Sequence, residues 1–205
     1  MSEESDEMDG LEVLACERCP ALCESRSRIV NGVGPAAADL LFVGEAPGES
    51  EDRQGEPFVG RSGDVLDSIL EECGLDRTAV RITNCVRCRP PENRDPTGEE
   101  LGNCRSYLDR EIERVDPELL VPLGKVPAEH LLDRSVAVTT EAGAVHDARI
   151  GDASYRVLVC VHPAATFYDP SQTDTLEATL ETAAELVGAS GGTGGESGQS
   201  RIDGF

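Results

Sequence analysis

The sequence predicts an α/β protein in which a mainly parallel sheet is covered by helices on both faces. Short apolar runs typical of buried strands alternate along the chain with longer segments whose apolar residues recur at helical spacing. Polar residues stand at the carboxyl ends of three of these runs, at Glu45, Asn84 and His162. Because ligands in open α/β sheets bind beyond the carboxyl ends of the strands, we expect the functional site to contain these residues.

Four segments are predicted strands, and together they give a central four-stranded sheet. Each is short and largely apolar, and Gly, Pro or polar residues stand at its ends. They are Leu40–Val43, 79–85, 117–124 and 155–163. Since a helical segment separates each strand from the next, the pattern favours parallel pairing over hairpins.

Four segments are predicted helices on the spacing of their apolar residues. They are 62–75, 97–115, 125–133 and 171–188. In the second, Thr97 and Glu100 have the spacing of a capping box, which marks where a helix starts. In the third, Pro127 lies in the first turn, where proline is tolerated.

Composition divides the chain into four parts. Residues 1–10 form an acidic leader that we expect to be disordered, and residues 11–188 have the pattern of one globular domain. Residues 189–198 are typical of a flexible Gly/Ser linker, and 199–205 form a separate terminal peptide. The amino terminus lacks the regions of a signal peptide, and no run approaches the ~20 apolar residues of a membrane span. We therefore predict a cytoplasmic monomer without membrane contact.

The charge balance is strongly acidic, with 40 acidic against 18 basic residues and a net charge of −22. A domain that binds nucleic acid in dilute salt is expected to be basic, so the charge alone argues against a nucleic-acid partner. Adaptation to molar salt is the competing interpretation, because the Debye length there is ~3 Å and surface charge acts over little distance. The single lysine, Lys125, favours this second interpretation. The charge then says little about the substrate.

Eight cysteines in a protein of a reducing compartment are more typical of ligands or core thiols than of disulfides. Two C-x-x-C pairs occur, but the first cysteine of the second pair follows Asn84 in a predicted strand and should face the core. We therefore choose as metal ligands Cys16, Cys19, Cys88 and Cys104. Four thiolates hold zinc or an iron–sulfur cluster equally well. Cys23, Cys73 and Cys160 are expected to be buried.

Four motifs then carry a resemblance: GEAPGESEDRQGEPFVGRSG, ITNCVRCRPPENRDP, PLG and VHPAA, in this order. Together with the amino-terminal C-x-x-C, they resemble a family 4 uracil-DNA glycosylase, the iron–sulfur type, from Cys16 to Gly188. The resemblance implies a three-layer α/β/α sandwich and a [4Fe-4S] cluster on the four chosen cysteines. It also implies a monofunctional hydrolase that flips uracil out of DNA and cleaves its N-glycosidic bond.

The resemblance assigns three residues to the base itself. Phe58 would stack on the flipped uracil, and the amide of Asn84 would pair with its edge. Uracil presents an O4 acceptor and an N3 donor, the reverse of cytosine, so a fixed amide rejects cytosine. His162 would donate a hydrogen bond to O2 as negative charge develops on the departing base.

The motifs do not single out one residue that activates the attacking water. Ala46 stands where some related glycosylases have an aspartate base, so Glu45 is the first candidate to polarise water or the sugar, and Asn93 is the second. Backbone groups at Glu45, Ala46 and Pro47 are expected to line the uracil pocket. Glu51 would either support this network or be a solvated surface charge.

The surroundings of the site suggest how DNA is held. Arg87, Arg89 and Arg94 share the loop of Cys88 and could meet phosphates. Phe167 or Tyr168 could fill the gap in the duplex, since the aliphatic and basic residues that usually follow HPAA are absent. Two alternatives stay open: a zinc-stabilised nucleic-acid-binding module, and a glycosylase for another deaminated base.

The terminal peptide has its own pattern, Q-x-x-I-x-x-F. Gln199, Ile202 and Phe205 resemble the peptide by which proteins bind a sliding clamp (PCNA). One helical turn would bring the two apolar residues together as a plug. A tether of this kind raises the local concentration of an enzyme on DNA without new DNA contacts.

Overall fold

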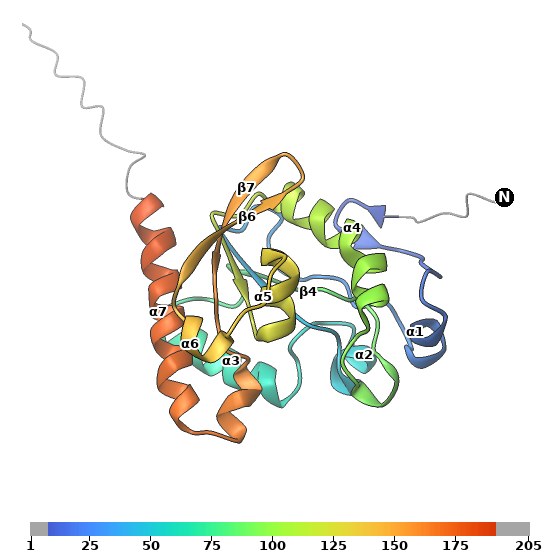
Figure 1. The fold of residues 1–205 in the computed structure, drawn as a ribbon, viewed down its shortest axis with the longest axis horizontal. Coiled ribbons are helices and arrows are strands. Elements are labelled where there is room, and N and C mark those ends of the chain that lie inside the picture. Colours follow the sequence, from blue (N-terminus) through green and yellow to red (C-terminus); the bar gives the residue numbers. More distant parts are fainter. Residues whose placement is uncertain (1–7, 192–205) are drawn as a thin grey trace, which may run out of the picture.

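A computed structural model of the chain describes residues 8–191, and a five-stranded sheet forms its centre (Figure 1). The strands lie in the order β4-β3-β5-β7-β6. Their bounds are β3 Leu40–Gly44, β4 Arg81–Asn84, β5 Leu119–Pro122, β6 Val145–Ile150 and β7 Ala153–Leu158. The first four in this order pair in parallel, and β6 is antiparallel to β7. The α/β class and the mainly parallel sheet are thus confirmed.

Strand β6 is missing from the sequence prediction, so the expected count of four strands is wrong. Its sequence, VHDARI, is rich in polar and charged residues. An antiparallel strand at the edge of a sheet needs only one apolar face, and Ala148 and Ile150 are its buried residues. The other residues of β6 are exposed or half-buried, which hides the strand from a search for apolar runs.

The helices have the following bounds: α1 Pro20–Ser25, α2 Glu49–Gln54, α3 Arg61–Glu72, α4 Gly98–Val115, α5 Lys125–Leu132, α6 Val138–Glu141 and α7 Ser171–Gly191. Two short 3-10 helices, η1 Pro91–Asn93 and η2 Pro163–Phe167, complete them. The predicted capping box is confirmed, because the Thr97 side chain accepts from the Glu100 amide and Glu100 accepts from the Thr97 amide.

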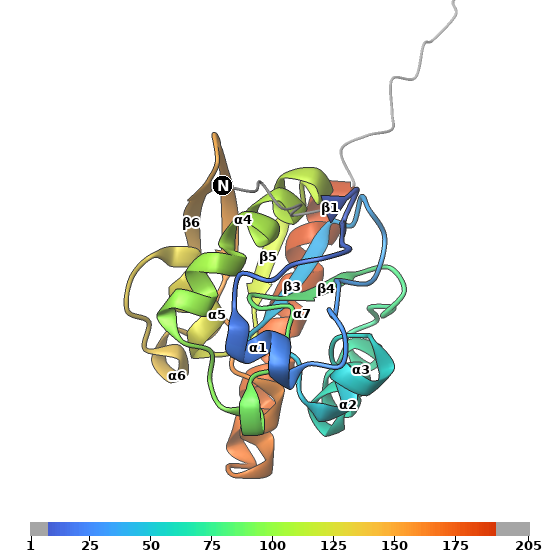
Figure 2. The ribbon, with the colours of Figure 1, turned by 90° about the vertical axis from the view of Figure 1, so that its right-hand side faces the viewer.

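The sheet separates two apolar cores, as its alternating side chains require. Leu40 and Phe42 of β3 join a core with α3 and α7, whereas Leu41 and Val43 join a core with α4 and α5. Figure 2 shows α4 and α5 on one side of the sheet and α3 on the other. The three-layer α/β/α sandwich is therefore confirmed.

The ends of the domain differ a little from the expected boundaries. Two short strands, β1 Met8–Asp9 and β2 Glu12–Val13, pair with each other, so β1 falls inside the expected leader. Helix α7 continues to Gly191, three residues into the expected linker. The predicted clamp peptide with Gln199, Ile202 and Phe205 lies outside the described residues. Within residues 8–191, no helix is long and apolar enough to cross a membrane.

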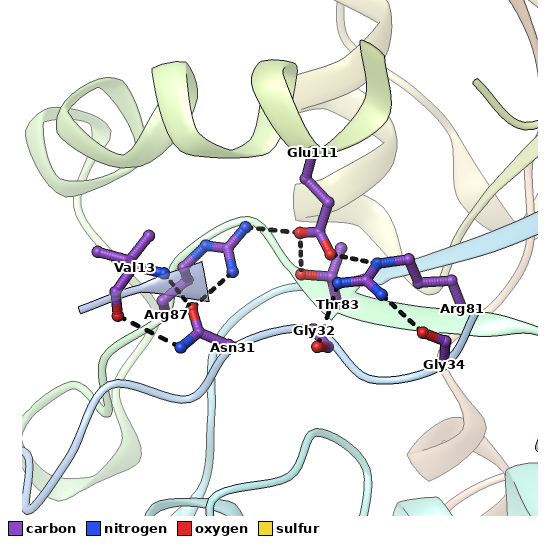
Figure 3. Close-up of polar contacts among 8 residues, drawn as sticks. All are labelled: Val13, Asn31, Gly32, Gly34, Arg81, Thr83, Arg87 and Glu111. Carbon is purple, nitrogen blue, oxygen red and sulfur yellow. Dashed lines mark hydrogen bonds and ion pairs between the residues drawn. The ribbon is translucent and has the colours of Figure 1, made fainter. Parts of the chain in front are cut away.

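A buried ion-pair network ties the amino-terminal segment to the sheet and to α4 (Figure 3). Glu111 of α4 is fully buried and accepts from Arg81 Nε at 2.6 Å, Arg87 Nη2 at 2.5 Å and Thr83 Oγ1 at 2.8 Å. Arg87 also donates to Asn31, which in turn accepts from the Val13 amide. Because Arg87 is 2% exposed, the expectation that it meets DNA phosphates is wrong.

Candidate active site

A cavity of about 180 Å³ opens at the carboxyl ends of β3 and β4. The loop that follows β3, the last residue of β4 and the loop that follows β7 all contribute side chains to it. The residues that line it are Glu45, Ala46, Gly48, Glu51, Phe58, Ser62, Asn84 and His162. The predicted uracil-contacting side chains therefore come together from three separate segments of the chain.

Asn84 and Phe58 meet over the last residue of β3, Gly44. In the parallel register Gly44 is the partner of Asn84. A β-carbon on Gly44 would lie 2.3 Å from Asn84 Oδ1 and 2.5 Å from the Phe58 ring. The space that a side chain would occupy is therefore filled by the amide and the aromatic ring. Asn84 itself is 3% exposed, so its amide is held in a nearly dry environment.

The loop that carries Phe58 is held in an unusual backbone conformation. Phe58 has a φ of 53°, in the left-handed region that costs a bulky residue conformational energy. Arg77 Nη2 donates to the carbonyl oxygens of Pro57 and Phe58 at 2.8 and 3.0 Å. Gly63 allows α3 to approach, because a β-carbon there would lie 2.0 Å from the Phe58 carbonyl oxygen.

Glu51 supports the same loop from the other side. Its Oε1 accepts from the Val59 amide at 3.2 Å and from the Gly60 amide at 3.0 Å. The residue is 9% exposed, so the interpretation as a solvated surface charge is wrong. Glu51 thus lines the cavity and also fixes the turn that leads from Phe58 into α3.

His162 faces Phe58 across the cavity, with ring centroids 5.9 Å apart and an interplanar angle of 32°. Its Nδ1 accepts from the Ala164 amide at 3.0 Å, which leaves the proton of the neutral ring on Nε2. Burial lowers the pKa of His162, so the ring is neutral near pH 7. The site therefore presents a neutral N–H donor.

The carboxyl group of Glu45, which lines the cavity, has a strongly raised pKa. Burial raises its pKa, and the negative charge of Asp95 and a hydrogen bond with Asp95 raise it further, to about 7. A carboxyl group with such a pKa changes its protonation state in the range where a general base works best. Asp95 escaped sequence reasoning, because nothing in RPPENRDP marks it as a partner of Glu45.

Two predicted residues do not line the cavity. Pro47 is buried, and Asn93 is exposed in η1 with its Oδ1 accepting from Arg89 Nε at 2.7 Å. Gly48 and Ser62 also line it, and both stand inside the first motif. Arg94, the third arginine expected to meet phosphates, donates two hydrogen bonds to the Glu100 carboxylate.

The four predicted ligand cysteines gather on the side of α4. Cys88 and Cys104 are buried in an apolar cluster with Val13, Leu22, Val86 and Tyr107, and Cys16 and Cys19 pack against it. Cys88 Sγ accepts from Arg26 Nη1 at 2.9 Å, and Cys19 Sγ lies 3.4 Å from Asn103 Nδ2. Within residues 8–191, no group of three or more His, Cys, Asp or Glu is arranged to hold a metal ion as it stands.

The other four cysteines are all expected in the core, and two of them are fully buried. Cys85 and Cys160 are buried, and burial raises the pKa of both thiols. Cys23 and Cys73 are half-buried rather than fully buried. All eight cysteines of the chain fall in its described part, and none of them forms a disulfide there.

Comparison with known proteins agrees with this fold and this cavity. Residues 31–186 match the family model described as the uracil DNA glycosylase superfamily. The chain therefore belongs to the uracil-DNA glycosylase superfamily. Its place within it is among the type-4 uracil-DNA glycosylases.

Individual relatives support that placement. The chain is 38% identical over 181 residues to the type-4 uracil-DNA glycosylase of Archaeoglobus fulgidus, covering 86% of this chain and 90% of that relative. It is 42% identical over 142 residues to the type-4 enzyme of Thermotoga maritima, covering 69% of this chain and 73% of the relative. A type-5 uracil-DNA glycosylase of Pyrobaculum aerophilum is 30% identical over 202 residues.

Proposed function

We propose that the cavity between Phe58, Asn84 and His162 receives a uracil flipped out of DNA, and that this chain hydrolyses the N-glycosidic bond there. The observation that carries the proposal is that these three side chains, from three segments, line one cavity. A base inside a duplex is out of reach, so such an enzyme must extrude it and read it in a pocket. The product is an abasic site, the starting point of base excision repair.

Recognition of uracil follows from the fixed amide of Asn84. Uracil N3–H needs an acceptor and its O4 needs a donor, which Oδ1 and Nδ2 of one amide supply together. The amide lies in the space that a side chain on Gly44 would fill, and Asn84 is 3% exposed. Cytosine would leave buried groups unpaired, at a cost of about 1–3 kcal/mol for each group.

Departure of the base is assisted by His162. As the bond breaks, negative charge develops on the uracil ring and positive charge on the sugar. The Nε2–H of the neutral ring would hydrogen-bond O2 more strongly in the transition state than in the substrate, which lowers the barrier. Removing one such donor typically costs about 2.7–4 kcal/mol in activation free energy.

Of the two candidates to position the attacking water near the sugar, Glu45 and Asn93, we choose Glu45. Glu45 lines the cavity, whereas the Asn93 side chain is exposed and engaged by Arg89. The Glu45 carboxylate would position the attacking water and favour the positive charge that develops on the sugar. Its pKa of about 7 allows it to accept a proton from water at neutral pH.

Cys16, Cys19, Cys88 and Cys104 would hold the iron–sulfur cluster of this family. The donor set fits, because a [4Fe-4S] cluster takes four thiolates, one on each iron, and these cysteines meet in one apolar cluster. The cluster would tie the amino-terminal segment to the loop of Cys88 and to α4. Broad visible absorbance and iron in anaerobically purified protein would support it, whereas bound zinc in colourless protein would contradict it.

Uracil-containing DNA is the proposed substrate partner, and a sliding clamp is proposed for the terminal peptide. Deleting Gln199–Phe205 should abolish binding to the clamp and leave uracil release from short oligonucleotides unchanged. Equal clamp affinity after deletion would contradict this assignment. Because the cluster would need its four cysteines in the reduced form, we also propose a reducing compartment, the cytoplasm, for the protein.

The direct test is incubation of the purified protein with a labelled oligonucleotide that contains one uracil, followed by alkaline cleavage. Strand cleavage at the uracil is expected, with none at a cytosine or thymine in its place. Asn84→Asp should lower uracil release roughly 10²-fold, because an acceptor then faces uracil O4 and neither is satisfied. Unchanged uracil release by Asn84→Asp would show that the amide does not read the base.

A further inference from the structure

Arg26 stands directly after α1 and reaches two of the cysteine-bearing segments at once. Its Nη1 lies 2.9 Å from Cys88 Sγ, and its Nη2 lies 2.7 Å from the carbonyl oxygen of Cys16. Its backbone amide donates to the Leu22 carbonyl oxygen and so closes the end of α1. Two nitrogens of the guanidinium are therefore held against the proposed cluster site.

The other contacts to the cysteine sulfurs differ in kind. Asn103 Nδ2 is a neutral donor and lies 3.4 Å from Cys19 Sγ. Arg87 reaches Cys104 through its backbone amide, and its guanidinium is paired with Glu111. Among these three contacts, only the one made by Arg26 brings a full positive charge into hydrogen-bonding distance of a sulfur.

We propose that Arg26 is a positioning residue for the iron–sulfur cluster, and that its charge-assisted hydrogen bond to Cys88 raises the reduction potential of the cluster and slows its loss. This inference rests on the cluster proposed above. Adding an electron makes a cluster and its thiolates more negative, and a nearby positive charge with an N–H donor stabilises that state. No redox step in uracil release is claimed, since hydrolysis of the glycosidic bond transfers no net electrons.

The contact requires arginine rather than another cation. Only the planar fork of a guanidinium can donate to the Cys88 sulfur and the Cys16 carbonyl oxygen together, because these acceptors use two different nitrogens. A lysine would keep the charge and lose one of the two contacts. Arg26→Lys and Arg26→Gln therefore separate the role of charge from the role of the fork.

The control is Arg28→Gln, which removes one positive charge two residues away. Arg28 is exposed, and its guanidinium lies against Gly55 rather than against a cysteine. Arg28→Gln should therefore leave the reduction potential unchanged.

The experiment uses the full chain, purified anaerobically, with three readouts. Iron and sulfide content with visible absorbance report the cluster, film voltammetry reports its one-electron potential against the electrode, and a chelator reports its rate of loss. Arg26→Gln should show a lower potential than the unmodified protein and lose absorbance roughly 10-fold faster. Arg26→Lys should lie between the two.

The outcomes separate this inference from the proposed cluster. If the unmodified protein holds zinc and no iron, the cluster assignment fails and the inference fails with it. If the cluster is present and Arg26→Gln has the same potential and the same rate of loss, only the inference is overturned. If Arg26→Gln holds no cluster, Arg26→Lys must hold one at a lowered potential, and an unchanged potential there overturns the inference.

Discussion

Gly44 and Asn84 end two neighbouring parallel strands as register partners, and a β-carbon on Gly44 would come within 2.3 Å of Asn84 Oδ1. The same β-carbon would lie 2.5 Å from the Phe58 ring. The missing side chain at Gly44 is what lets the amide and the ring converge on one cavity. The geometry of base recognition therefore depends on a residue that has no functional group.

Gly44→Ala should strongly reduce the activity of the enzyme while leaving it folded. The added methyl group must displace the Asn84 amide, the Phe58 ring or both, and a misplacement of ~1 Å in such a site costs about 10² in rate. We expect kcat/KM for uracil release from a single-stranded oligonucleotide to fall by about that factor. Gly102→Ala is the matched control, because nothing lies within 4 Å of a β-carbon at that exposed helical position. Wild-type activity in Gly44→Ala would show that the packing around Gly44 is not essential.

The acid side of the pH–rate profile should follow Glu45. If its carboxylate form acts on water or the sugar, kcat/KM should rise as the pH increases through about 7, the raised pKa of this group. The negative charge of Asp95 contributes to that rise in pKa, so Asp95→Asn should lower the Glu45 pKa and move the acid limb to lower pH. Burial still acts in the variant, so the limb should stay above the ordinary glutamate range.

Rates measured from pH 5 to pH 9 on a single-stranded substrate would show this shift. Glu45→Gln is the control, since it should lower the rate and remove the acid limb altogether. An Asp95→Asn profile that coincides with the unmodified one would mean that Asp95 does not set the protonation of Glu45.

The sequence predicted the centre of the parallel sheet well because β3 and β5 are buried on both faces and stand out as apolar runs. It missed β6, whose residues alternate in burial at the sheet edge. Phe58, Asn84 and His162 were predicted because each stands in a specific motif. Asp95 and Arg26 were missed because their importance depends on contacts made across the fold, with Glu45 and Cys88. Arg87 was misjudged for the same reason, since a basic residue in a loop gives no sign of a buried partner on α4.

Glu111→Gln should destabilise the domain strongly. Glu111 is fully buried and compensates the charges of Arg81 and Arg87, which are 4% and 2% exposed. Removing one partner of a buried ion pair typically costs about 3–5 kcal/mol, because an uncompensated charge is left behind. Urea unfolding should show a loss of that size in the free energy of unfolding. The exposed Glu113→Gln on the same helix should change it by no more than about 0.5 kcal/mol.

Tyr168 should matter for duplex substrates and not for single strands. Its side chain is 89% exposed six residues after His162, whereas the neighbouring Phe167 is 40% exposed and its ring stacks with the Arg61 guanidinium at 4.5 Å. Extruding a base from a duplex leaves a gap in the stack, which an inserted side chain can fill, but a single strand has no such gap. Tyr168→Ala should therefore reduce kcat/KM on uracil in duplex DNA by about 10-fold, equivalent to ~1.4 kcal/mol, and leave single-stranded substrates unaffected. Tyr168→Phe keeps the ring and should behave as the unmodified enzyme. An equal loss on both substrates would place Tyr168 in general DNA binding instead of in base extrusion.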